Sequence, residues 1–403
     1  MRERINTTFR ALRSRNFRLF FFGQGISLIG TWMQRIAMSW LIYRLTGSAF
    51  LLGVAGFSSH IPIFLISPFA GVLIDRFSRR RILFLSQTLA MLQAFVLAFL
   101  VLSGSVQVWH VIALGIVLGI SSAFDIPGRQ SFYSQLVSKK EDIQNAIALN
   151  STLFHLARFI GPTLAGFVIA FFGEGICFLL NGVSFVAMLV ALIMMKIEKI
   201  NNSISGKKIS EEFKEGFSYV FKSAPIKKIL LIVALVSLFG APYVVLLPIF
   251  AKDILGGGPV TLGLLTSFAS IGALFSAFYI ASIKTNEGTD KRLVIFGLIF
   301  SFSLIAFAFS KILGLSLFLI SFVGAGMMAN NVSANSLIQN LISEDKRGRV
   351  MSLYTFSHQG VMPFGELLFG ILAGGIGAGP ALAMGGVLSA LSVFIFGRKI
   401  SSN

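Results

Sequence analysis

The sequence predicts an all-α integral membrane protein, with twelve transmembrane helices arranged as two pseudo-symmetric bundles of six. Three observations support this prediction. The chain of 403 residues is 55% hydrophobic and only 12% charged, whereas about a quarter of the residues in a soluble domain are charged. Apolar runs of the length that crosses a hydrocarbon core, about 20 residues, recur along the whole chain. Basic residues gather in alternate loops.

Short polar segments separate the apolar runs, and none of the runs alternates as the strands of a membrane barrel would. The predicted spans are 17–43, 49–74, 82–103, 108–128, 147–172, 175–195, 229–251, 260–283, 292–310, 313–337, 350–374 and 379–397. A short helix over Thr8–Arg15 is expected beneath the first span. The basic start leads directly into this span, so no cleavable signal is predicted.

The distribution of positive charge predicts the orientation. Net charge is +18, and 29 of the 34 Lys and Arg residues lie at the two ends or in every second loop. The opposite loops hold only Arg44, Lys252 and Lys311. Such asymmetry places both termini in the cytoplasm, in a cell (inner) membrane. A nucleic-acid-binding protein would instead gather its basic residues on one face, so no nucleic-acid partner is expected.

One long polar connection divides the chain. We expect an N-terminal six-helix bundle over 1–195, a cytoplasmic linker over 196–228 and a C-terminal six-helix bundle over 229–403. The segment 135–138 (Gln-Leu-Val-Ser) is echoed by 340–343 (Asn-Leu-Ile-Ser), which suggests a repeat. Parallel repeats of six spans build one large group of secondary transporters.

The loop between the second and third spans carries a charge motif. Gly71 permits close helix approach, and Asp75 is a lone acid beside Arg76, Arg79 and two further arginines. Such a cluster can form a latch that holds one conformation, or the arginines can simply set topology. The loop resembles the Gly-x-Leu-x-Asp-Arg-x-Gly-Arg-Arg/Lys signature of the major facilitator superfamily, and departs from it at Ser78.

The resemblance implies partners for this latch. The acid matching Asp75 would meet the start of span eleven, near Gly348–Val350, where a helix N-terminus attracts negative charge. The arginine matching Arg79 would pair with an acid at the inner end of span four. Asp125 is the only acid in that span. A lone intramembrane carboxylate is expected to have a cationic partner.

Span five contains Gly161, Pro162 and Gly166, with Ala157 and Ala165 nearby. Small residues let helices approach, and proline loosens a helix. The run resembles the Gly-Pro-x-x-Gly-Gly motif of antiporters and exporters in the superfamily, although the two alanines stand where glycine is common. The resemblance implies export; a kinked packing helix without directional meaning is the alternative.

The resemblance covers essentially the entire chain. It is closest to the subfamily that contains the enterobactin exporter and related secretion proteins. The stretches that carry this likeness are Gly30–Leu41, Asp125–Gln130 and Asn145–Ser151. They mark the family and not a substrate.

Among the ionisable residues inside predicted spans, four are candidate functional charges: Arg35, Arg158, His358 and Glu366. A charge at the centre of a membrane helix costs about 2.5–3.5 kcal/mol on insertion scales, so it normally faces a polar cavity or a partner. We expect Glu366 to bind a proton or a cationic substrate group and to couple its proton release to transport. The alternative is a structural ion pair between Glu366 and Arg35.

Two further residues are candidate substrate contacts. Arg158 can attract an anionic substrate, or it can pair with Asp125 or a helix end. Asn331 in span ten, with Asn330 and Asn335, can line a cavity. Interhelical hydrogen bonding explains these asparagines equally well.

No enzyme signature is present. The sequence has no phosphate-binding Gly-x-x-x-x-Gly-Lys-Ser/Thr loop, and the single Cys177 permits no Cys-based metal site, so we expect no cofactor and no metal. The energy for transport must then come from an ion gradient or from the substrate's own gradient, and the resemblance implies protons as the default of the family. We expect proton-coupled export of a small amphipathic molecule, a siderophore or drug-like compound, by alternating access in a lipid-embedded monomer. The alternatives are a lipid or lysophospholipid transporter and a non-transporting membrane sensor.

Overall fold

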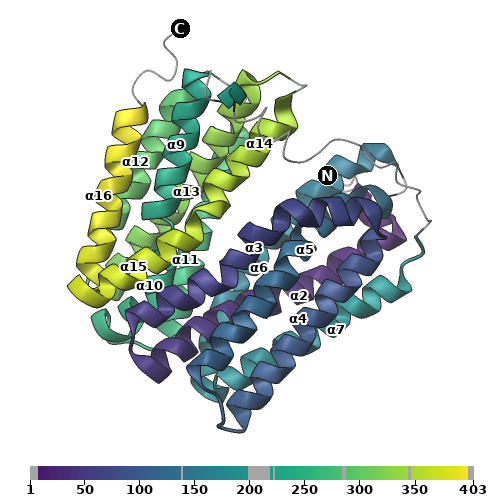
Figure 1. The fold of residues 1–403 in the computed structure, drawn as a ribbon, viewed down its shortest axis with the longest axis horizontal. Helices are drawn as coiled ribbons and strands as arrows, with labels where there is room; N and C mark the ends of the chain where they lie inside the picture. The colour runs from purple at the N-terminus through teal and green to yellow at the C-terminus, as the bar shows by residue number, and fades with distance from the viewer. Residues whose placement is uncertain are drawn as a thin grey trace. The chain divides into compact units, whose positions relative to one another are not determined.

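The computed structural model describes residues 8–137, 139–197, 218–220, 223–283, 287–343 and 346–397. Within these ranges nearly every residue is helical and there is no strand (Figure 1). The side chains at 68, 71, 72, 75, 76, 140 and 348 lie outside the description. The predicted all-α membrane fold is confirmed.

Each of the twelve predicted spans falls on a helix or on a broken run of helices. The first six are α2 (Arg15–Thr46), α3 (Ala49–Arg76), α4 (Arg79–Leu102), α5 (Val108–Leu136), α6 (Ile143–Phe172) and α7 (Glu174–Met194). The single helices of the second half are α11 (Pro259–Ser282), α12 (Thr289–Ala308), α13 (Leu313–Leu341) and α16 (Ala378–Gly397). Eleven of the twelve segments are both long and apolar enough to cross a membrane. The twelfth is α2, where Gln24, Gln34 and Arg35 lower the hydropathy of a 32-residue helix.

The remaining two spans are interrupted, and each contains a short π-helical turn. One consists of α9 (Ala224–Phe239), α10 (Tyr243–Ile249) and the π turn η3 (Phe250–Ile254). The other consists of α14 (Arg347–Thr355), the π turn η5 (Phe356–Gly360) and α15 (Met362–Ile376). Proline lacks the amide hydrogen that continues a helix and suits its first turn. Pro363 accordingly stands at the beginning of α15.

The chain forms two compact units. The first contains residues 1–46 and 58–204, and the second contains 47–57 and 205–403. The beginning of α3 therefore groups with the second unit, and the rest of α3 with the first. The predicted boundaries at 195 and 229 stay a prediction, and most of the predicted linker 196–228 lies outside the described residues.

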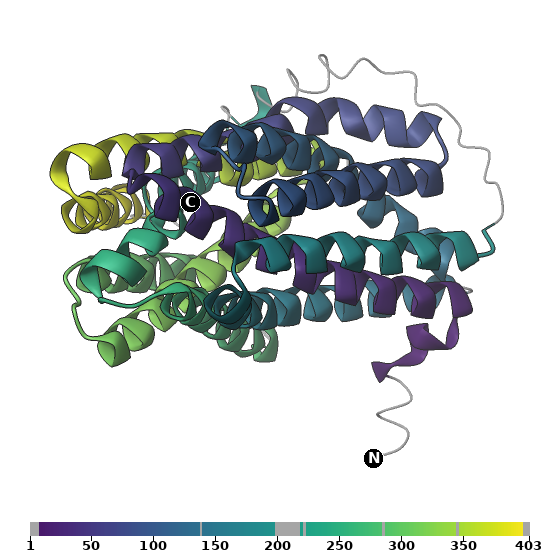
Figure 2. The same cartoon turned by 90° about the horizontal axis from the view of Figure 1, so that it is seen from below.

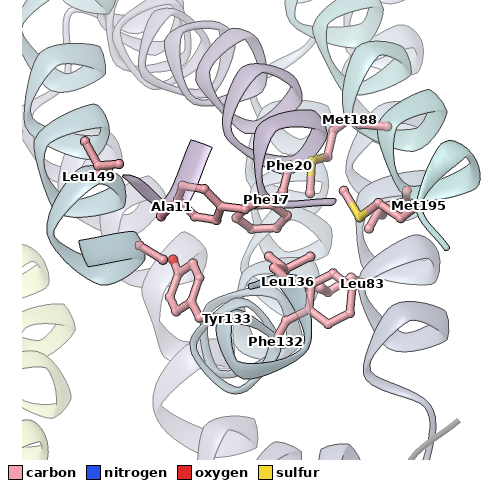
Figure 3. Close-up of a cluster of buried hydrophobic side chains, with 13 residues drawn as sticks. Ala11, Phe17, Phe20, Leu83, Phe132, Tyr133, Leu136, Leu149, Met188 and Met195 are labelled. Carbon is pink, nitrogen blue, oxygen red and sulfur yellow. The ribbon is translucent and has the colours of Figure 1, made fainter. Parts of the chain in front are cut away.

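The first unit has an aromatic core at the end that carries the N-terminus. In the unit α2 packs on α7, α6 and α5, and α4 packs on α5 and α7. Residues from five helices and the N-terminal turn meet in this core (Figure 3). Phe20 lies edge-on to both Phe132 and Tyr133, with ring centroids about 6 Å apart. Edge-on packing of this kind is favoured by the ring quadrupoles.

The N-terminal segment is fastened to the first unit by polar contacts. The predicted helix over Thr8–Arg15 is only a 3-10 turn, η1 (Arg10–Arg13), which lies beside the start of α2 (Figure 2). Arg10 forms an ion pair with Asp142 at 3.0 Å. Asn145 accepts a hydrogen bond from the Ala11 amide at 3.0 Å and donates one to the Thr8 carbonyl at 2.8 Å. These bonds satisfy backbone groups that a short turn leaves open.

The second unit is built on neighbouring pairs of helices. Its main contacts are α11 with α13, α12 with α13 and α16, and α9 with α16. Close approach is achieved by glycines facing backbone. A Cβ on Gly326 in α13 would lie 2.7 Å from the Phe300 Cα in α12. Small residues of this kind permit dense packing in a membrane, where burial of apolar surface does not by itself drive helix association.

Candidate functional site

Two arginines in the first unit share one aromatic ring. The guanidinium carbon of Arg35 lies 5.0 Å from the ring centroid of Trp32, and that of Arg158 lies 5.4 Å from it. Trp32 and Arg35 are one turn apart on α2, whereas Arg158 comes from the middle of α6. Both distances fall within the range of a cation–π interaction, about 6 Å. We call Trp32, Arg35 and Arg158 the cation cluster.

The small residues of α6 explain how Arg158 reaches this ring. A Cβ on Gly161 would lie 2.6 Å from the Trp32 Cβ and 3.0 Å from the Ile29 carbonyl oxygen. Only glycine therefore allows α6 to approach α2 at this turn. Arg158 lies one turn before Gly161, on the same side of the helix. Pro162 and Gly166 are also buried, and α6 continues through Pro162 without a break.

Three of the four described carboxylates of the first unit pair with arginines other than Arg158. Glu174 at the start of α7 makes two contacts with Arg44, at 2.6 and 3.3 Å. Asp142 pairs with Arg10. Glu141 is exposed and precedes α6. Among the described side chains, no carboxylate forms an ion pair with Arg158, and its buried Nε has no hydrogen-bond partner.

Asp125 has local partners that differ from the expected one. Its carboxylate pairs with Arg129 at 2.7 Å, one turn along α5, and accepts a hydrogen bond from Gln87 at 2.6 Å. Arg79 instead donates to the Ser131 carbonyl at 3.0 Å and to Ser134. The expected pairs of Asp125 with Arg79 and with Arg158 are therefore not formed here, because an arginine four residues away on the same helix neutralises the carboxylate.

The other latch residues belong to the end of α3 and to the start of the eleventh span. The side chains of Gly71, Asp75 and Arg76 lie outside the described residues, as does that of Gly348 at the start of the eleventh span. The role of this loop as a latch stays a prediction.

Glu366 lies in α15 of the second unit with 2% of its surface exposed. The first part of α3, which belongs to the same unit, packs directly on it. A Cβ on Gly56 would lie 3.0 Å from the Glu366 Oε2. A Cβ on Gly53 would lie 2.7 Å from the Glu366 carbonyl oxygen and 2.9 Å from the Gly370 Cα. A buried carboxylate in a membrane helix is costly and typically functional.

His358 and Asn331 form a second polar group in this unit. The Asn331 amide nitrogen lies 2.7 Å from the His358 Nε2. Tyr354 donates to the Asn331 carbonyl at 3.0 Å and stacks on the His358 ring. His358 belongs to the π turn η5, and π turns frequently mark functional positions. Asn330 points elsewhere and donates to the Leu293 carbonyl at 2.9 Å.

The predicted ion pair of Glu366 with Arg35 stays a hypothesis. Arg35 belongs to the first unit and Glu366 to the second. Each has interactions of its own beyond those described above, so neither residue is free.

Sequence reasoning missed several of these residues. Trp32 lies within the family stretch Gly30–Leu41, and an aromatic residue three positions before an intramembrane arginine is a signal that the sequence contains. The spacing Gly53-x-x-Gly56 is likewise a signal in the sequence, because it predicts a close helix contact. A buried network on α2, α4 and α7 was not predicted: Gln34 donates to Gln93 at 2.7 Å and accepts from Asn181 at 2.6 Å.

Metal chemistry finds little support in the described part of the chain. No group of three or more His, Cys, Asp or Glu side chains there could hold a metal ion. The buried Cys177 is a free thiol.

Comparison with known proteins identifies the architecture. The family model described as "Transmembrane secretion effector" matches residues 6–400. Among curated proteins, the chain is 24% identical over 387 residues to the staphyloferrin A transporter of Staphylococcus aureus, covering 94% of both chains. It is 24% identical to macrolide efflux protein A of Streptococcus pyogenes, covering 93% of this chain and 94% of that protein. It is also 24% identical to the multidrug efflux pump Tap of Mycolicibacterium fortuitum, covering 88% and 87%.

Solved structures share the fold. A POT family transporter in complex with 5-aminolevulinic acid matches with a TM-score of 0.77 and 12% identity, over 96% of this chain and 97% of that chain. A bacterial homologue of the iron transporter ferroportin, in an inward-facing state, matches with a TM-score of 0.71 and 19% identity, over 96% and 99%. At these identities the similarity concerns the fold alone.

Proposed function

The chain belongs to the transmembrane secretion effector family of the major facilitator superfamily, and from this premise we propose that it exports a small amphipathic molecule by proton antiport. The family and the relatives are transporters and not enzymes, and the chain is a multi-pass membrane protein with a small-molecule substrate. The observation that carries export is the similarity, over nearly the whole chain, to a siderophore transporter and to efflux proteins. The buried Gly161-Pro162 motif is consistent with it.

Glu366 supports the proton-coupled part of the proposal. Its carboxylate is almost fully buried in a helix that spans the membrane, against the glycines of α3. A carboxylate can take up or release a proton, and acidic residues inside membrane helices commonly mark proton relays whose surroundings change during transport. Alternating access, in which the surroundings of a fixed site change from one side of the membrane to the other, supplies such a change.

The test is flux in vesicles made from purified protein. Proteoliposomes with an imposed pH gradient are loaded with a panel containing a catecholate siderophore, a macrolide and a lysophospholipid. Proton antiport predicts that at least one of the first two moves against its own gradient while protons move the opposite way. Equal flux with and without the pH gradient would contradict proton coupling. If only the lysophospholipid moved, the proposal of small-molecule export would be wrong and the chain would be a lipid transporter.

We also propose the predicted orientation, with both termini in the cytoplasm of a cell membrane and the protein acting as a monomer. The basis is the asymmetric charge of the loops. In a Cys177→Ser background, Ser103→Cys should react with an impermeant maleimide on intact cells. Arg13→Cys should react only after permeabilisation. The reverse pattern would overturn the orientation.

A further inference from the structure

The cation cluster concentrates positive charge within the first unit. Arg35 is exposed and Arg158 is half-buried, and both lie over the Trp32 ring. We propose that this cluster binds the negatively charged group of a small organic anion, so that the transported molecule is an anion. This inference rests on the proposed function, since it names the class of substrate for the same transporter.

The first step of the case is charge balance. Asp125, Asp142 and Glu174 each pair with another arginine, and none of the described carboxylates pairs with Arg158. The buried Nε of Arg158 is a donor without an acceptor. A guanidinium cannot be deprotonated in a protein. The positive charge of Arg158 is therefore permanent, and an external anion would balance it.

The second step is the repulsion between the two arginines. Both guanidinium carbons lie within 5.4 Å of one ring centroid, so two positive charges gather at the same aromatic ring. Like charges at short range destabilise each other where water is scarce. If Arg158 only stabilised the packing of the helices, a single cation over the Trp32 ring would be sufficient. Two cations converging on a shared aromatic ring favour an anion between or beside them, which both forks can bind.

The third step is preorganisation. The turn of α6 that carries Arg158 is held against α2 at Gly161, where a Cβ would meet Trp32. Trp32 is held in turn by Phe154, whose ring lies edge-on at 5.8 Å. The donors are thus positioned before a ligand arrives, which lowers the cost of binding. The small residues of α6 then serve substrate binding as well as helix packing.

The experiment measures binding to purified full-length protein in a nonionic detergent, at constant ionic strength. The probes are citrate, benzoate and inorganic phosphate, with tetraphenylphosphonium as the cationic comparison. The readouts are the thermal melting midpoint and, in a Trp40→Phe, Trp109→Phe background, the fluorescence of Trp32. We expect saturable stabilisation and a change in Trp32 emission with at least one organic anion, and no response to tetraphenylphosphonium.

The variants separate charge from structure. Arg158→Gln should weaken anion binding at least about tenfold, since it removes a charge-assisted hydrogen bond. Arg158→Lys should weaken it less, because the charge is kept and only the planar fork is lost. Arg18→Gln is the matched control, since it removes an exposed arginine elsewhere on α2, and it should bind as the wild type does. Equal binding by Arg158→Gln and wild type would overturn the proposal.

Further arms distinguish other outcomes. If no organic anion gives a saturable response, the anion site is wrong even if export is measured in vesicles. If anions bind through Arg158 but no compound is moved in vesicles, the anion site stands and the export proposal fails. If phosphatidylglycerol in nanodiscs raises the melting midpoint of the protein while free anions do not, the ligand is a lipid headgroup. The proposal of a small organic anion is then overturned.

Discussion

The cation cluster and the surroundings of Glu366 hold ionisable groups inside membrane spans in two different ways. In the first, exposed and half-buried arginines rest on an aromatic ring. In the second, a carboxylate with 2% exposure is enclosed by glycines of a neighbouring helix. The arginines keep their charge at any working pH, whereas a carboxylate can gain or lose a proton. The difference suggests that the first region binds and the second responds to protons.

The largest effect is expected at Glu366. Glu366→Gln should lower flux driven by a pH gradient at least about tenfold, because glutamine keeps the shape but cannot exchange a proton. Arg158→Gln should lower flux at every gradient without changing its dependence on the gradient. The measurement is initial flux in proteoliposomes over a series of imposed pH gradients, with the exposed Glu287→Gln of the same unit as control. If the flux of Glu366→Gln depended on the pH gradient as that of the wild type does, the two regions would not differ in their response to protons.

The next largest effects are expected from changes to the helix contacts that position each region. Gly161→Ala and Gly53→Ala should each destabilise the protein by about 1–3 kcal/mol, because the added methyl group overpacks a closed contact. A methyl group added at Gly53 would meet mainly backbone atoms, which a side-chain shift cannot move away. Gly53→Ala should therefore lower the stability more than Gly161→Ala does. The checks are thermal melting and denaturant unfolding in micelles. Gly374→Ala, which meets nothing within 4 Å, is the control; a loss as large there would mean that alanine itself, and not contact, is responsible.

The hydrogen bond between Asn331 and His358 in the second unit should contribute less. Asn331→Ala should cost about 1 kcal/mol, the typical net value of one hydrogen bond, because the bond between Asn331 and His358 is lost. Gradient-dependent flux should keep its shape. Asn340→Ala, exposed on the same helix, should be close to neutral. If the flux of Asn331→Ala, measured in the same vesicles, depended differently on pH, Glu366 would not be the only residue that couples flux to protons.

The smallest effect is expected at the shared ring. Trp32→Phe should cost about 0.5–1 kcal/mol, since phenylalanine binds cations less well than tryptophan and fills less space. Thermal melting would measure this loss, and Trp109→Phe, exposed at the start of α5, provides the comparison. An increase in stability would indicate that the two arginines strain the ring instead of being stabilised by it.

Twelve spans followed from the sequence alone, because a helix of about 20 apolar residues is a local property set by the thickness of the membrane. The same holds for the small-residue run of α6 and for the short list of intramembrane charges, which named Arg35, Arg158, His358 and Glu366 correctly as residues within helices. Periodicity did not reveal the π turns at η3 and η5, where only a few residues change their hydrogen bonding.

Partners were decided by tertiary structure. Asp125 pairs with Arg129 one turn along the same helix, a spacing that the sequence alone contains, whereas its hydrogen bond from Gln87 of α4 depends on how the two helices pack. The meeting of Arg158 with Trp32, and of Gly53 with Gly370, joins residues more than a hundred positions apart. The sequence by itself determined which helices form and which charges they carry, since both depend on neighbours along the chain. Only packing between helices determined which charges share a ring and which lie buried.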